Sequence, residues 1–86
     1  MHRIILHRNA VKFYRKADES LKKRVADAID VIARNPRLDG HIKKLKGDLK
    51  HMHRFRMGDL RIFFEIDDAE ESVWIKAVEW RGSAYK

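Results

Sequence analysis

Two arginines face each other across a predicted hairpin, and their side chains suit a phosphate group. The pair Gly58-Asp59 separates two runs rich in arginine, aromatic and β-branched residues, so we expect a two-residue turn there. Such a turn places Arg56 directly opposite Arg61. Like charges in that position repel each other, and an anion between them would remove the repulsion. Because guanidinium groups bind phosphate through two parallel hydrogen bonds, this hairpin predicts a phosphate site.

The alternation of side chains extends this site to a whole face of the predicted sheet. The same turn pairs Met57 with Leu60, Phe55 with Ile62, and Arg54 with Phe63. Opposed residues share a face, so cations and aromatics gather on one side. The basic face is expected to hold Arg54, Arg56, Arg61, Phe63, Glu65, Trp74, Lys76, Val78 and Trp80. The apolar face is expected to hold Phe55, Ile62, Phe64, Ile66, Val73, Ile75 and Ala77.

Arginines beside exposed aromatics are typical of nucleic-acid binding, because bases stack on the rings while phosphates meet the cations. Two other interpretations remain open at this point. Glu65 or Asp59 could pair with the arginines as ordinary surface salt bridges, which contribute little to stability. Trp74 and Trp80 could complete a hydrophobic edge instead of stacking a base.

Two histidines and a lysine cluster precede the hairpin. His51 and His53 are expected on the apolar side as packing residues, because a metal site there lacks a third ligand. A bulge would turn them towards the basic face, where an imidazole could act as a general base. Lys43, Lys44 and Lys46 could protect a strand edge or contact the RNA backbone.

Composition bounds the class of protein. The chain has 86 residues, of which 44% are hydrophobic and 38% charged, so we expect a single ordered domain over residues 1–86. Twenty Lys and Arg against 13 Asp and Glu give a net charge of +7, which favours a polyanionic partner. The sequence contains no cysteine and no long apolar run, so we expect a cytoplasmic protein without disulfides or membrane spans.

The elements that position these residues can be read from hydrophobic periodicity. We expect a strand over residues 3–7, a helix capped by Asn9, and a second helix capped by Asp18 or Ser20. The second helix should end near Asn35, because Pro36 disfavours helical geometry in the residue before it. A short edge strand within residues 37–48 and strands over 51–57, 60–66 and 72–80 complete an α+β domain.

Three stretches carry a likeness to a known family: KKLKGDL at 43–49, RFRMGDLRIFFEI at 54–66 and WRGSAYK at 80–86. Together they resemble the RelE/ParE toxin superfamily, and the RelE branch in particular. The resemblance covers the whole chain. It implies the order β-α-α-β-β-β-β, with the two N-terminal helices packed on one face of a small, mainly antiparallel, twisted sheet.

The resemblance also implies an activity. RelE-branch toxins are ribosome-dependent endoribonucleases that cut mRNA in the ribosomal A site, without a metal or another cofactor. It implies that Arg61 holds the scissile phosphate, that Arg81 stabilises developing charge or helps protonate the leaving oxygen, and that Tyr85 stacks on or orients the nucleotide. Arg54 falls where the family places a basic residue on the preceding strand. The residues expected to contact RNA are Lys43, Lys44, Lys46, Arg56, Lys76 and Trp80.

The chain departs from the family pattern at three positions. Met52 stands where some members carry a second catalytic lysine, Leu60 replaces a tyrosine, and Trp80 replaces a common histidine. Two alternatives therefore stay open: a ParE-like inhibitor of gyrase, and a catalytically degenerate module that binds RNA or antitoxin. The partners that the resemblance implies are a cognate antitoxin, the 70S ribosome with its mRNA, and DNA only through the toxin–antitoxin complex.

Overall fold

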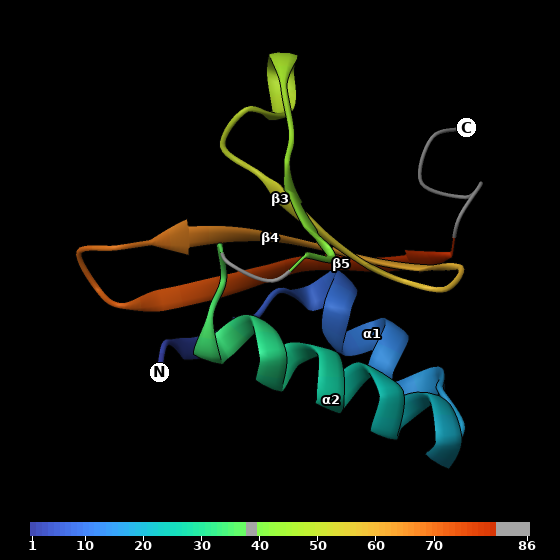
Figure 1. Cartoon of the computed structure of the whole chain (residues 1–86). Helices are drawn as coiled ribbons and strands as arrows, with labels where there is room; N and C mark the ends of the chain where they lie inside the picture. Colours follow the sequence, from blue (N-terminus) through green and yellow to red (C-terminus); the bar gives the residue numbers. More distant parts are fainter. Residues whose placement is uncertain (38–39, 81–86) are drawn as a thin grey trace.

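The computed structural model of the protein describes residues 1–37 and 40–80. Both helices lie on one side of a five-stranded sheet whose strands are arranged in the order β1-β5-β4-β3-β2 (Figure 1). The elements are β1 (Arg3–Leu6), α1 (Arg8–Lys16), α2 (Glu19–Arg34), β2 (Ile42–Lys44), η1 (Gly47–Leu49), β3 (His53–Met57), β4 (Leu60–Asp67) and β5 (Ser72–Trp80). The predicted α+β class and element order are confirmed.

The sheet is mainly antiparallel. Only the pairing of β1 with β5 is parallel among the described strands, and it places the N-terminal strand at one edge. The predicted hairpin register is confirmed: Arg56 lies opposite Arg61 and Arg54 opposite Phe63. Gly58 adopts a positive φ of 57° in the turn, a conformation that glycine reaches without steric cost.

Local signals set the ends of the helices. The Asp18 side chain accepts a hydrogen bond of 2.8 Å from the Leu21 N–H and so caps α2. At the other end, α2 stops at Arg34, immediately before Asn35 and Pro36. The predicted cap of α1 is wrong, because His7 takes that position and its Nδ1 accepts from the Asn9 N–H at 3.3 Å.

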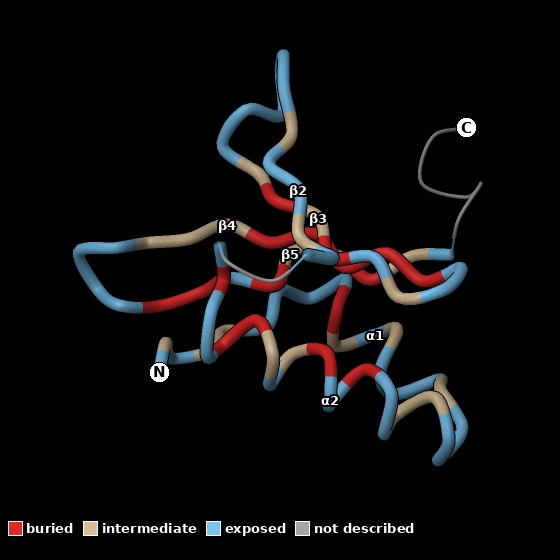
Figure 2. Tube along the Cα trace, in the orientation of Figure 1, coloured by how far each residue is buried: buried red, intermediate tan, exposed pale blue. Residues whose placement is uncertain are grey.

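The core lies between the sheet and the helices. One stripe of α2, formed by Val25, Ala28 and Ile32, is buried against the sheet, and buried residues line the facing sides of both layers in Figure 2. Phe64 at the centre of β4 is fully buried. Each such large apolar side chain contributes roughly 1.5–3 kcal/mol through burial, so this layer pair supplies most of the driving force for folding.

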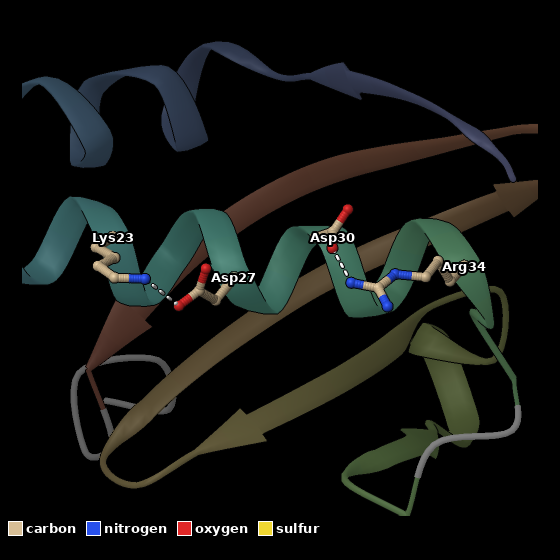
Figure 3. A network of polar contacts seen from close by, with 4 residues as sticks. All are labelled: Lys23, Asp27, Asp30 and Arg34. Carbon is tan, nitrogen blue, oxygen red and sulfur yellow. Dashed lines mark hydrogen bonds and ion pairs between the residues drawn. The ribbon is translucent and has the colours of Figure 1, made fainter.

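The outer side of α2 is polar. Lys23 pairs with Asp27 at 3.2 Å, and Arg34 pairs with Asp30 further along the helix (Figure 3). Exposed pairs at this spacing are worth about 0.3–0.5 kcal/mol each. They support the helix locally and leave its apolar stripe to hold it on the sheet.

A β-bulge on β5 changes which face of the sheet the later β5 residues lie on, so the predicted faces are partly wrong. Phe63 pairs with Ala77 whereas Phe64 pairs with Ile75, so Lys76 is an extra residue in the ladder. Every β5 side chain after the bulge therefore changes face relative to strict alternation. The placement of Val78 on the basic face is wrong, because Val78 is 5% exposed within the core.

The bulge also moves Trp80 to the side of the helices. Its ring lies 5.9 Å from the ring of Phe13 in α1, centroid to centroid. Ala77, predicted to be in the core, lies opposite Phe63 on the other face. Trp80 thus completes a hydrophobic edge, as the alternative interpretation of this residue expected.

Candidate functional site

The face of the sheet without helices carries two neighbouring rows of paired residues. The first row holds Lys43, Arg54, Phe63 and Ala77, and the second holds Arg56, Arg61 and Glu79. The segment with β2, η1 and the start of β3 rises beside this face (Figure 1). We call these two rows the basic face.

Arg61 is fixed by the backbone of its own hairpin. Its side chain is buried, with the residue 8% exposed, and Nη1 donates hydrogen bonds of 2.6 Å to the Gly58 carbonyl and 3.0 Å to the Leu60 carbonyl. Hydrogen bonds from a charged donor are worth about 1.5–3 kcal/mol. The guanidinium is therefore held in one place before any ligand arrives, which is the condition for strong electrostatic stabilisation.

Arg54 has an unsatisfied donor. Its Nε is buried and has no hydrogen-bond partner in the described part of the chain. Leaving such a donor unpaired costs about 1–3 kcal/mol, so buried polar groups without partners call for an explanation. An anion bound on this face of the sheet would accept this hydrogen bond. It would also lie close to Arg56, which is exposed on the same face.

Glu65, one of the acidic residues on this side of the sheet, pairs with residues other than Arg54 and Arg56. Glu65 on β4 has its Oε1 3.1 Å from His51 Nε2 and its Oε2 3.5 Å from Lys76 Nζ. Within residues 1–37 and 40–80, neither Arg54 nor Arg56 forms an ion pair. Surface salt bridges therefore account for Lys76 and leave these two arginines to be explained.

The two histidines lie in different environments. His53 is 8% exposed, stacks on Phe64 with 5.4 Å between ring centroids, and has a buried Nδ1 that bonds to no described residue. Burial lowers the pKa of His53, and the nearby charges of Arg37 and Lys44 lower it further. The prediction that His53 is a packing residue is confirmed, and this imidazole favours its neutral form.

His51 does not share the face of His53, so the prediction that both lie on the apolar side is wrong. The strand β3 begins only at His53, and the Met52 N–H bonds back to the Leu49 carbonyl at 2.8 Å in a turn. Strict alternation does not apply before the strand begins. The turn carries the His51 ring over the basic face to Glu65.

The sequence matches the family model described as ParE toxin of type II toxin–antitoxin system, parDE, over residues 4–85. The chain belongs to this toxin family. No curated protein matches the sequence.

Solved structures show the same fold at low sequence identity. The toxin–antitoxin complex RelBE2 from Mycobacterium tuberculosis matches with a TM-score of 0.81 and 23% identity, covering 93% of this chain and 98% of that one. The isolated Escherichia coli RelE toxin gives 0.78 and 16%, covering 94% and 85%. The YoeB/ParE toxin from Agrobacterium tumefaciens gives 0.80 and 15%, covering 92% and 98%.

The toxin brings only some of the predicted site residues together. Arg54, Arg56, Arg61 and Lys43 share the basic face, and Lys76 lies beside it at the bulge. Arg81 and Tyr85 lie outside the described residues.

Three predicted RNA contacts lie elsewhere. Trp80 is on the side of the helices, Lys44 pairs with His53 on that same side, and Lys46 lies before η1, outside the strands. Lys44 differs from its neighbour Lys43 only because adjacent strand residues point to opposite faces.

The contact between His51, Glu65 and Lys76 was not predicted from the sequence. No signal in the sequence marks the bulge that brings Lys76 there.

The described residues contain no cluster of three or more His, Asp or Glu side chains that could hold a metal ion. Across residues 1–37 and 40–80, no helix is long and apolar enough to cross a membrane.

Proposed function

We propose that this toxin is a cytoplasmic, ribosome-dependent endoribonuclease that cleaves mRNA in the ribosomal A site, and that a cognate antitoxin protein silences it. The observation that carries the proposal is the pairing of Arg61, fixed by backbone carbonyls, with neighbouring arginines that have no acidic partner among the described residues. A toxin that only binds a protein has no need of a buried, preorganised guanidinium beside an unsatisfied arginine donor.

In the proposed reaction the ribose 2′-hydroxyl attacks its own 3′ phosphate. The bond from phosphorus to the 5′ oxygen of the next nucleotide breaks, and a 2′,3′-cyclic phosphate forms. Arg61 and Arg54 stabilise the extra negative charge of the transition state, and Arg81 assists from beyond β5. A single preorganised donor of this kind is worth roughly 3–4 kcal/mol. The reaction needs no metal ion.

RNA binding and orientation fall to the surrounding side chains. Lys43 and Arg56 contact the phosphate backbone from the basic face, and Tyr85 orients the nucleotide. Phosphate contacts of this type position the strand without reading its sequence. The ribosome then supplies the codon register, which suits a domain of this size.

The cognate antitoxin is proposed on the basis of the family and of the solved relatives. The E. coli and Pyrococcus horikoshii relatives are RelE toxins in complexes with RelB antitoxins. A net charge of +7 makes an acidic antitoxin segment a complementary partner.

The test is to induce the wild-type toxin, Arg54→Ala, Arg61→Ala and Arg15→Ala in a translation extract and to map mRNA 5′ ends by primer extension. We expect in-frame A-site cuts from the wild type and from Arg15→Ala, whose exposed arginine on α1 forms no ion pair with a described residue. Both basic-face variants should lose cleavage by about 100-fold or more. Circular dichroism of each variant separates a loss of chemistry from a loss of folding.

A second function has an observation in its favour, because the matching family model is named for ParE. If the toxin instead inhibits gyrase, growth stops while the mRNA remains intact, and a supercoiling assay shows inhibition. If the well-folded wild type shows neither mRNA cleavage nor gyrase inhibition, the protein is a degenerate module that binds RNA or antitoxin.

A further inference from the structure

A hollow of about 540 Å³ lies between the β4–β5 hairpin and the turn that joins η1 to β3. Its lining includes His51 from that turn, Glu65 from β4, and Trp74 and Lys76 from β5. The volume falls within the range of small-molecule sites, which is roughly 300–1,000 Å³. Trp74 is 39% exposed, so part of its ring is open to a base that enters the hollow.

Within this hollow three side chains form a chain of contacts. Lys76 Nζ lies 3.5 Å from Glu65 Oε2, and Glu65 Oε1 lies 3.1 Å from His51 Nε2. Lys76 reaches Glu65 because the β-bulge makes it an extra residue in the strand. The His51 side chain is 60% exposed, and its Nδ1 bonds to no described residue. The carboxylate thus orients the ring and leaves Nδ1 available to take up a proton.

We propose that His51 is the general base of the RNA cleavage, and that Glu65 and Lys76 are its positioning residues. The inference rests on the proposed function and deepens it. His51 Nδ1 takes the proton of the 2′-hydroxyl while the 2′ oxygen forms its bond to phosphorus. The bond to the 5′ oxygen breaks, and that oxygen takes a proton from solvent. Glu65 stabilises the imidazolium that forms.

The register places this base beside the proposed phosphate site. Glu65 lies two residues from Phe63 on β4, and Phe63 pairs with Arg54. Residues two apart on a strand are about 7 Å apart, so a nucleotide whose phosphate binds at Arg54 has its ribose next to His51.

Other charged groups face the hollow and bear on its pH dependence. Glu65 and Lys76 contact each other beside His51, and Asp67 and Asp68 from the end of β4 and the following turn line the same hollow. Asp68 pairs with Arg37, with hydrogen bonds of 3.0 and 3.1 Å. Asp67 accepts from the Glu70 N–H in the turn at 3.2 Å. Glu65 is the carboxylate among these that touches the imidazole.

The test measures single-turnover mRNA cleavage on ribosomes between about pH 5 and 8, the range in which imidazoles titrate. His51→Gln should lower the rate by about 100-fold or more and abolish the rise of the rate with pH. Glu65→Gln should lower the rate less, because the imidazolium that forms loses its counter-charge. His2→Gln, which changes a histidine before β1, should behave as the wild type.

Added imidazole should restore part of the rate of a His51→Ala variant but none of the rate of Arg61→Ala. Cleavage by His51→Gln at the wild-type rate and with the wild-type pH profile overturns the inference and leaves an ordinary surface ion pair. In that case the nuclease itself still stands. A wild-type toxin that does not cut overturns both proposals.

Discussion

At the scale of single residues, His53 couples the stability of the toxin to pH. Its ring is packed on Phe64, its Nδ1 bonds to no described residue, and burial lowers its pKa below the ordinary value of 6.5. The unfolded chain therefore binds this proton at a higher pH than the folded chain does. Below the unfolded pKa, protonation favours the unfolded state, so stability is highest above about pH 6.5 and falls as the pH decreases.

The His53→Phe variant tests this linkage. The phenyl ring keeps the stacking on Phe64 and removes the titrating group, so the free energy of unfolding should fall less between about pH 7 and 5 than in the wild type. Urea denaturation at several pH values measures the difference. His2→Gln, which leaves His53 in place, should keep the wild-type slope. A His53→Phe slope equal to that of the wild type would assign the acid sensitivity to other groups.

The two histidines also show how far residue patterns predict the site. The opposition of Arg56 and Arg61 followed from the turn alone, because both residues lie within regular strands. The spacing of His51 and His53 predicted a shared face, but the chain turns between them, and alternation holds only inside a strand. The pattern of the sequence therefore predicted which arginines share a face and did not predict the histidine–carboxylate contact.

At the scale of elements, the Gly58-Asp59 turn fixes the register that the basic face needs. Gly58 has a φ of +57°, which residues with a Cβ rarely adopt. A Cβ there would cause no steric clash, because among the described residues it meets only the Arg24 side chain, at 3.5 Å. The penalty of Gly58→Ala is therefore conformational, and we expect it to lower the free energy of unfolding by about 1–2 kcal/mol. Gly40→Ala is the matched control, because a Cβ at Gly40 meets no described residue within 4 Å and no positive φ is involved.

Chemical denaturation of both glycine variants measures these changes. Gly40→Ala should have little effect or stabilise slightly, because alanine restricts the unfolded chain more than glycine does. Equal losses in the two variants would show that the positive φ of Gly58 does not limit the hairpin.

Turns and bulges differ in how visible they are in the sequence. The hairpin was predictable because Gly-Asp between two strand-forming runs is a strong local signal. The bulge at Lys76 was not predictable, because neither glycine nor proline marks it in the sequence. Packing of the residues that follow it stabilises the bulge. With the shifted register Val78 is buried in the core, and Trp80 contacts Phe13 of α1 while it stays partly exposed. The shifted register thus depends on tertiary contacts, which the local sequence pattern does not predict.

At the scale of the whole molecule, the net charge of +7 favours polyanions in general, whereas the proposed function needs RNA to bind at the basic face. Helix α1 is also basic, with Lys12 and Arg15 exposed on it. General attraction would use both surfaces equally. A defined binding face would use Lys43 and Arg56 and spare the helix.

The salt dependence of binding separates these two cases. For single-stranded RNA, the slope of log K against log salt becomes shallower by about 0.7 for each phosphate that the protein no longer neutralises. Lys43→Gln with Arg56→Gln should therefore reduce the slope by about 1.4, whereas Lys12→Gln with Arg15→Gln, an equal change in charge, should leave it nearly unchanged. Fluorescence anisotropy with 2′-O-methyl RNA measures binding without cleavage, because the attacking hydroxyl is blocked. Equal reductions from both pairs would mean that RNA binds through the net charge of the molecule. The proposal that the basic face positions the strand would then be wrong.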